Sequence, residues 1–266
     1  MTQDATPADW SKVVAALGPF ARRSRFDRLN EVLSKRRGGL HVVLENVGDP
    51  CNVAAILRTA EGLGVQHIHK IESITPSGHF QQPAGRKVGR RALSNVAMGA
   101  GRWLTINHYR SPIDCCHRLH ELDLRILASD CPPCEQDVAA GFVVESRLSD
   151  FDAAAARPID DAMLTTDDDT RGVAIVFGNE KRGVSRAFIE RADQAFYIPM
   201  AGLTQSFNIS VAVAMTLYAA IASGRFGEGT LSEEERTELL GRWLLRDVKA
   251  AKQILRSEAQ LDFDDF

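Results

Sequence analysis

Three stretches of the chain place glycines and polar side chains directly after predicted strands. In chain order they read ENVGDPCNVAAILRTA from Glu45, FGNEKRGVS from Phe177 and YIPMAGLTQSFNISVAVAMTLYAA from Tyr197. Such loops expose backbone N–H groups, and their Asn, Ser, Glu and Arg side chains can hold a polar ligand or stabilise a developing charge. Because open α/β sheets bind ligands beyond the carboxyl ends of their strands, we expect the three loops to form one site.

The third stretch carries the strongest local pattern. A short strand ending at Pro199 leads into a loop with Ser206, Asn208 and Ser210 at alternate positions, and a helix follows from about Phe207. This helix is apolar nearly all round, so we expect it to be buried. The alternative interpretation is an ordinary strand-turn-helix unit in which Asn208 serves only as the N-cap.

Phosphate-binding and esterase motifs do not fit these loops. The second loop has the length of a P-loop, but Val184 stands where the phosphate-binding lysine belongs. No GxGxxG sequence follows the first strand, and there is no GxSxG elbow. The sequence therefore disfavours a nucleotide hydrolase, a dinucleotide-dependent dehydrogenase and an esterase.

Composition is that of an ordinary globular protein of 266 residues, which is long enough for one large domain with extensions. No apolar run reaches the ~18 residues of a membrane span, and the N-terminus lacks the layout of a signal peptide, so we expect a cytoplasmic protein without a membrane partner. Five cysteines do not form a disulfide framework. Cys131 and Cys134 form a lone CxxC, which is weak evidence for a metal, and we expect reduced thiols and no metal site.

Charge is distributed unevenly. The net charge is −3, yet residues 145–169 hold eight acidic side chains against two arginines, which leaves a net charge of +3 for the remainder. Basic residues gather between Arg22 and Arg37 and again between Arg86 and Arg91. Such clusters are usually solvated helix faces, but two of them in one chain make nucleic acid a reasonable partner.

The elements that must position the loops alternate between strand and helix. We expect strands at 41–45, 66–71, 103–107, 124–129 and 172–178 and helices at 52–63 and 112–122, a pattern typical of a parallel sheet covered by helices. Residues 1–39 and 226–266 are expected to be helical extensions of a central domain, 40–225. Residues 131–171, rich in Ala and Asp, are expected to be an acidic insertion.

The three stretches, in this order, resemble the signature motifs of the SPOUT superfamily, and more narrowly those of the TrmH (SpoU) family of RNA ribose 2′-O-methyltransferases. The resemblance covers about residues 40–224 apart from the insertion. It implies an α/β fold with a parallel sheet, helices on both faces and a C-terminal deep trefoil knot. It also implies a homodimer and S-adenosyl-L-methionine as the cofactor.

The resemblance also assigns roles to residues. Those implied around the cofactor are Ser129, Gly178, Glu180, Ile198, Met200, Gly202 and Phe207. The implied catalytic set is Arg58, Asn52, Ser206 and Asn208, the last two in their own site or across the dimer. An arginine rarely gives up its proton, so we expect Arg58 to grip a phosphate and stabilise the developing alkoxide. Taken singly, Arg58 could be a surface cation, Asn52 an N-cap and Glu180 a solvated carboxylate.

The RNA target is inferred from the extensions. The arginine-rich N-terminal helix and the terminal helix resemble those of the tRNA guanosine enzymes that methylate the D-loop, so tRNA is favoured and no DNA partner is expected. The side chains expected to grip RNA phosphates are Arg22, Arg25, Arg28, Arg86, Lys87 and Arg90. The alternatives are an rRNA 2′-O-methyltransferase and a catalytically silent knotted RNA-binding protein.

Overall fold

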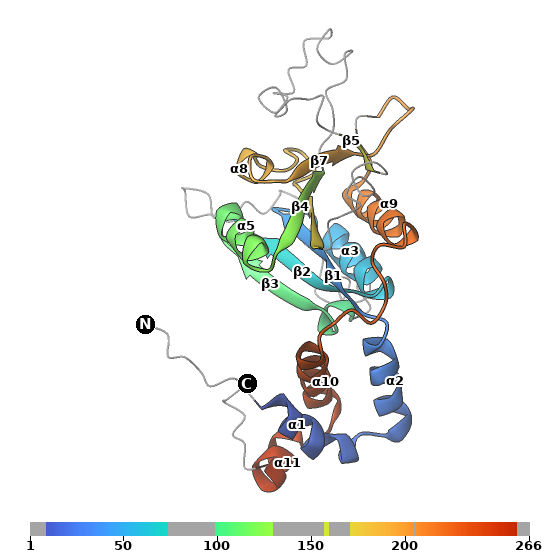
Figure 1. Cartoon of the computed structure of the whole chain (residues 1–266), viewed down its shortest axis with the longest axis vertical. Coiled ribbons are helices and arrows are strands. Elements are labelled where there is room, and N and C mark those ends of the chain that lie inside the picture. Colours follow the sequence, from blue (N-terminus) through green and yellow to red (C-terminus); the bar gives the residue numbers. More distant parts are fainter. Residues whose placement is uncertain (1–8, 74–98, 130–156, 160–170, 205, 260–266) are drawn as a thin grey trace. The chain divides into compact units, whose positions relative to one another are not determined.

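The computed structural model describes residues 9–73, 99–129, 157–159, 171–204 and 206–259 (Figure 1). The chain divides into two compact units, one formed by Met1–Arg36 with Glu228–Phe266 and the other by Arg37–Gly227. Among the described residues, no helix combines the length and the apolar character needed to span a bilayer.

A seven-stranded sheet forms the centre of the larger unit, and all its pairings are parallel. The strands are β1 (Arg37–Glu45), β2 (Val65–Ile71), β3 (Thr105–Tyr109), β4 (Leu124–Ser129), β5 (Arg157–Pro158), β6 (Gly172–Phe177) and β7 (Gln194–Tyr197). Their order across the sheet is β3-β2-β1-β6-β4-β7-β5. The predicted parallel α/β sheet is confirmed.

Helices cover both faces of this sheet (Figure 1). Side chains alternate between faces along each strand. Val42 and Ile175 therefore join the core under α3 (Pro50–Gly62) and α9 (Ile209–Ala222). Their neighbours Val43 and Val176 join the core under α5 (Pro112–Glu121) and α8 (Arg186–Ile189). The continuous apolar sequence of β6 thus follows from burial on two sides.

Two strand boundaries differ from the prediction. β1 begins at Arg37 instead of residue 41 and includes both glycines of Gly38-Gly39. β3 spans 105–109 instead of 103–107, because the chain before it forms a 3-10 turn, η2 (Ala100–Arg102). The later position of β3 places Tyr109 at the carboxyl end of the strand.

Within the single chain, α9 is buried on one side only, and its burial against a second subunit stays a prediction. Ile209, Val213 and Leu217 pack into the core beside α3. Val211, Met215 and Tyr218, in contrast, are 45%, 41% and 68% exposed. These three side chains have the i, i+4, i+7 spacing of one helix face, so the chain leaves an apolar stripe uncovered.

The second unit consists of helices from both ends of the chain. They are α1 (Trp10–Leu17), η1 (Gly18–Phe20), α2 (Arg23–Leu33), α10 (Glu233–Asp247), α11 (Ala251–Ile254) and the π-helical turn η4 (Leu255–Ala259). Ser232 caps α10 by accepting the Glu235 N–H at 3.1 Å. α10 packs against α1 so closely that a Cβ at Gly241 would lie 2.7 Å from the Trp10 ring. The C-terminal helical extension is interrupted between α10 and α11, where Ala250 has a φ of 57°.

Candidate functional site

Strand register brings the three loops to one edge of the sheet. Leu44 pairs with Phe177, Ala128 with Val176 and Ser129 with Phe196. The loops that follow β1, β6 and β7 therefore start side by side, and β4 ends between the last two. This places Ser129 next to the strand that leads into Ile198, as expected for a common site.

Glu45 ties the first loop to the second. Its side chain is only 2% exposed, and its carboxylate accepts the Ser185 N–H at 2.8 Å. In addition, the Asn179 side chain donates to the Asn46 carbonyl at 2.8 Å. Sequence reasoning missed Glu45, although a carboxylate at the end of an apolar strand was a signal that a buried donor lies nearby.

The second loop folds back on itself at Gly178. Asn179 and Gly183 exchange backbone hydrogen bonds of 3.0 and 2.7 Å. A Cβ at Gly178 would lie 2.0–2.1 Å from the backbone of Gly183 and Val184. Glycine is therefore required here by the turn itself, independently of any cofactor.

Glu180 faces the first loop. Its carboxylate accepts hydrogen bonds from the backbone N–H groups of Gly48 at 3.2 Å and Asp49 at 3.4 Å and from the Asn52 side chain at 3.1 Å. Burial by itself raises the pKa of Glu180, but hydrogen bonds from its own backbone N–H, from Asn52 and from the loop amides outweigh burial and hold the pKa below its ordinary value. Glu180 is thus a fixed, ionised carboxylate that braces two loops.

A hydrogen-bonded series continues from Asn52 to the third loop. Asn208 donates to the Asn52 side-chain oxygen at 3.1 Å and accepts the Ser210 N–H at 2.9 Å and the Ser210 hydroxyl at 2.6 Å. A carboxylate only accepts and a backbone N–H only donates, so both amide orientations are determined by the ends of the series. Asn208 is the N-cap of α9, and it also joins the third loop to the first.

Arg58 and Ser206 lie outside this network. Arg58 is exposed on α3, and its six-residue separation from Asn52 corresponds to about 9 Å along the helix axis. Ser206 is exposed just before Asn208. The structure therefore brings Asn52, Glu180 and Asn208 together within one chain, whereas Arg58 and Ser206 make no hydrogen bond or ion pair with other described residues.

The third loop has the openness of a ligand site. Leu203 is fully exposed, and a Cβ at Gly202 would meet no atom within 4 Å. From Pro199 to Thr204, no backbone group hydrogen-bonds to another described residue. Ile198, Met200 and Phe207 are half-buried along the same segment. Apolar side chains beside exposed backbone fit a cofactor such as a nucleoside sulfonium.

Of the six predicted RNA-binding residues, three are described by the structure and three are not. Arg25 makes two hydrogen bonds of 3.0 and 3.2 Å to the Asp247 carboxylate of α10, and Arg28 pairs with Glu31 at 2.6 Å. Arg22 is exposed just before α2. Arg86, Lys87 and Arg90 lie outside the described residues.

The chain is similar to RNA 2′-O-methyltransferases. Residues 39–218 match the model of the SpoU rRNA Methylase family. The chain is 32% identical to the tRNA (guanosine(18)-2′-O)-methyltransferase of Escherichia coli K12 over 74% of this chain and 69% of that protein. Identity to the Thermus thermophilus protein of the same description is 31% over 83% of this chain and 96% of that protein. The crystal structure of the A. aeolicus TrmH/SpoU tRNA modifying enzyme matches with a TM-score of 0.61 at 26% identity, covering 85% of this chain and 98% of that chain.

Proposed function

The chain belongs to the SpoU rRNA methylase family, and we propose that it transfers a methyl group from S-adenosyl-L-methionine to a ribose 2′-hydroxyl of RNA. The observation that carries the proposal is the network of Asn52, Glu180 and Asn208, which joins the three motif loops at one edge of the sheet. The relatives above are described as acting on guanosine 18 of tRNA, so a guanosine in the tRNA D-loop is the favoured target.

The cofactor is assigned to the loop after β7. The exposed backbone between Pro199 and Thr204 would bind its polar parts, and Ile198, Met200 and Phe207 its apolar parts. Ser129 lies at the adjacent strand end. Bound S-adenosyl-L-methionine supplies an electrophilic methyl group, so the protein mainly needs to place the 2′-hydroxyl in line with it.

Glu180 keeps Asn52 in one orientation, and Asn52 does the same for Asn208. The network therefore presents polar groups in fixed orientations to the ribose. The exposed Arg58 guanidinium grips the adjoining phosphate in two hydrogen bonds and stabilises the oxyanion that forms. Ser206 is free to hydrogen-bond the ribose. These roles need no deprotonated arginine, and the 2′-hydroxyl proton is released to solvent as the methyl group is transferred.

We propose a deep trefoil knot and a homodimer for the larger unit. The position of β4 between β6 and β7, together with the packing of α9 on α3, supports the knot. The apolar stripe of Val211, Met215 and Tyr218 supports the homodimer, because a second subunit would remove it from water. A site shared between subunits would bring Arg58 to the reacting ribose.

The remaining assignments concern the extensions and the location. We propose that residues 1–39 and 226–266 act as RNA-binding extensions of a catalytic domain, 40–225, which carries the insertion 131–171. Arg22, Arg28 and the basic residues Arg86, Lys87 and Arg90 would grip phosphates in a cytoplasmic RNA.

The test is transfer of a labelled methyl group from S-adenosyl-L-methionine to unmodified tRNA, followed by mapping of the modified nucleotide. Arg58→Ala should abolish turnover and leave the cofactor Kd within about twofold, because the guanidinium contacts only the RNA. Near-wild-type methylation by this variant would refute the catalytic assignment. Methylation of rRNA but not of tRNA would show that rRNA is the substrate. RNA binding without methyl transfer would identify a catalytically silent RNA-binding protein.

A further inference from the structure

A chain of buried polar side chains crosses three strands of the sheet on the α5 face. His41 on β1 contacts the Gly38 carbonyl through Nε2 at 2.9 Å and His69 Nε2 through Nδ1 at 2.9 Å. His69 on β2 contacts the Tyr109 hydroxyl on β3 through Nδ1 at 3.0 Å. His41 is 5% exposed and His69 is fully buried. None of these side chains belongs to the methyl-transfer network.

The donors and acceptors in this series of hydrogen bonds can be assigned in only one way. The Gly38 carbonyl accepts only, so His41 Nε2 must donate to it and Nδ1 of the neutral ring must accept. His69 Nε2 then donates to His41, which leaves His69 Nδ1 as the acceptor for the Tyr109 hydroxyl. Burial lowers the pKa of both imidazoles, in agreement with neutral rings. The Tyr109 proton is therefore directed inward, and its oxygen offers only lone pairs to the outside.

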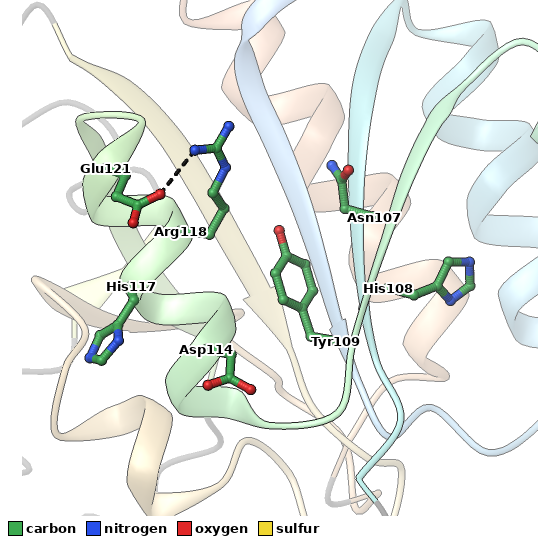
Figure 2. A pocket seen from close by; sticks show the side chains of 7 residues that line it. All are labelled: Asn107, His108, Tyr109, Asp114, His117, Arg118 and Glu121. Carbon is green, nitrogen blue, oxygen red and sulfur yellow. Dashed lines mark hydrogen bonds and ion pairs between the residues drawn. The ribbon is translucent and has the colours of Figure 1, made fainter. Parts of the chain in front are cut away.

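A cavity of about 490 Å³ lies on the outer side of Tyr109. Figure 2 shows it between the end of β3 and one face of α5, with lining side chains Asn107, Asp114, His117, Arg118 and Glu121. Arg118 is neutralised by Glu121, with 2.9 Å between its Nη1 and the carboxylate. Burial raises the pKa of Tyr109 to about 12, so the hydroxyl stays protonated at neutral pH.

The chemistry of this cavity favours a neutral, donor-bearing group over an anion. Asp114 and the Tyr109 oxygen present hydrogen-bond acceptors, the Arg118–Glu121 pair is neutral as a unit, and the lining histidines His108 and His117 can each donate or accept. A phosphate or carboxylate, which only accepts, would meet repulsion from Asp114. A group that brings N–H donors would satisfy these acceptors, and Asn107 can supply a donor or an acceptor beside them.

The cavity lies at the same edge of the sheet as the motif loops. Tyr109 pairs with Ile71, which pairs with Glu45, the last residue before the first loop. Two strand spacings separate Tyr109 from Glu45, about 10 Å. A nucleotide that neighbours the reacting ribose in single-stranded RNA can span this distance with its base turned outward.

We propose that this cavity binds the amino-bearing edge of a nucleobase, guanine, adenine or cytosine, next to the nucleotide that is methylated. The proposal rests on the function proposed above. It makes Asp114 and Tyr109 determinants of RNA sequence preference, because their oxygens accept hydrogen bonds from base amino groups and uracil has no amino group.

The protein side of the test uses Asp114→Asn, which keeps the side-chain shape and removes acceptor charge at an exposed position. This variant should raise the KM for tRNA about five- to tenfold, with kcat and the cofactor Kd unchanged. The matched control is Glu190→Gln, because Glu190, the C-cap of α8, pairs with Arg186 at 2.7 Å and lies outside the cavity. Thermal melting verifies that all variants fold.

The RNA side uses transcripts in which single bases flanking the methylated nucleotide lose an amino group, for example guanosine replaced by inosine. One position should weaken methylation by the wild-type protein about tenfold, and Asp114→Asn should remove most of that penalty. Active wild-type protein together with an unchanged KM in Asp114→Asn would overturn this proposal alone. Absence of methyl transfer from the wild-type protein to any RNA would overturn the proposed function, and this proposal with it.

Discussion

Acid should destabilise the sheet through the buried histidines, and the effect can be calculated for His69. Burial lowers the pKa of His69 from 6.5 to about 3 in the folded protein. As the pH falls below 6.5, the unfolded chain binds a proton that the folded chain does not accept until about pH 3. Stability is therefore present above pH 6.5 and is lost as the pH falls. Linkage gives a loss of about 2 kcal/mol between pH 7.5 and pH 5 for this one ring. His41, whose pKa is also lowered by burial, adds to the loss.

The perturbation is His69→Gln. The glutamine amide can donate to His41 and accept from Tyr109, so it replaces the hydrogen bonds of the imidazole without titrating. The pH dependence of stability should therefore be smaller in the variant by about 2 kcal/mol over the same interval. His120→Gln, at an exposed position of α5, is the matched control for a histidine-to-glutamine change.

Hydrogen exchange of peptides from β1 and β2 is the appropriate assay, because it reports the opening free energy of the unit that holds the histidines. Protection factors at pH 7.5 and pH 5, corrected for intrinsic exchange, give that free energy for each protein. Equal losses in the wild type and in His69→Gln would show that His69 does not remain neutral in the folded state, and the assigned direction of the hydrogen-bond chain would then be wrong.

Three further predictions concern the loop turn, the helical unit and the uncovered stripe. Gly178→Ala should destabilise the larger unit by about 3 kcal/mol because its Cβ would overlap backbone atoms, whereas Gly202→Ala, in open space, should change stability by less than about 0.5 kcal/mol in chemical denaturation. Arg25→Ala should weaken the helical unit by about 1 kcal/mol, and a double-mutant cycle with Asp247→Ala should recover most of this as coupling; purely additive losses would rule the pair out as a brace. Tyr218→Glu should shift the protein from dimer to monomer in light scattering, and an unchanged mass would move the subunit interface away from α9.

Local sequence signals were sufficient for most of the larger unit. The apolar run of β6 predicted a central parallel strand, and Asn208 was identifiable as an N-cap because a short amide side chain before an apolar helix has few other uses. In the helical unit, Ser232 followed by Glu235 has the pattern of a capping box, and α10 begins there. The three motif loops were recognised because their side chains follow strand ends, which topology forces to one edge of the sheet.

Tertiary structure decided what the sequence could not, because strand register and side-chain orientation are properties of the folded sheet. Nothing local connects His41, His69 and Tyr109, which are brought into one hydrogen-bonded chain only by the pairing of β1, β2 and β3. The same holds for Glu45 and Ser185, 140 positions apart. The exposed face of α9 could likewise not be predicted from the sequence. Composition showed that the helix avoids water, but only the packing of the chain showed which face α3 and the sheet leave open.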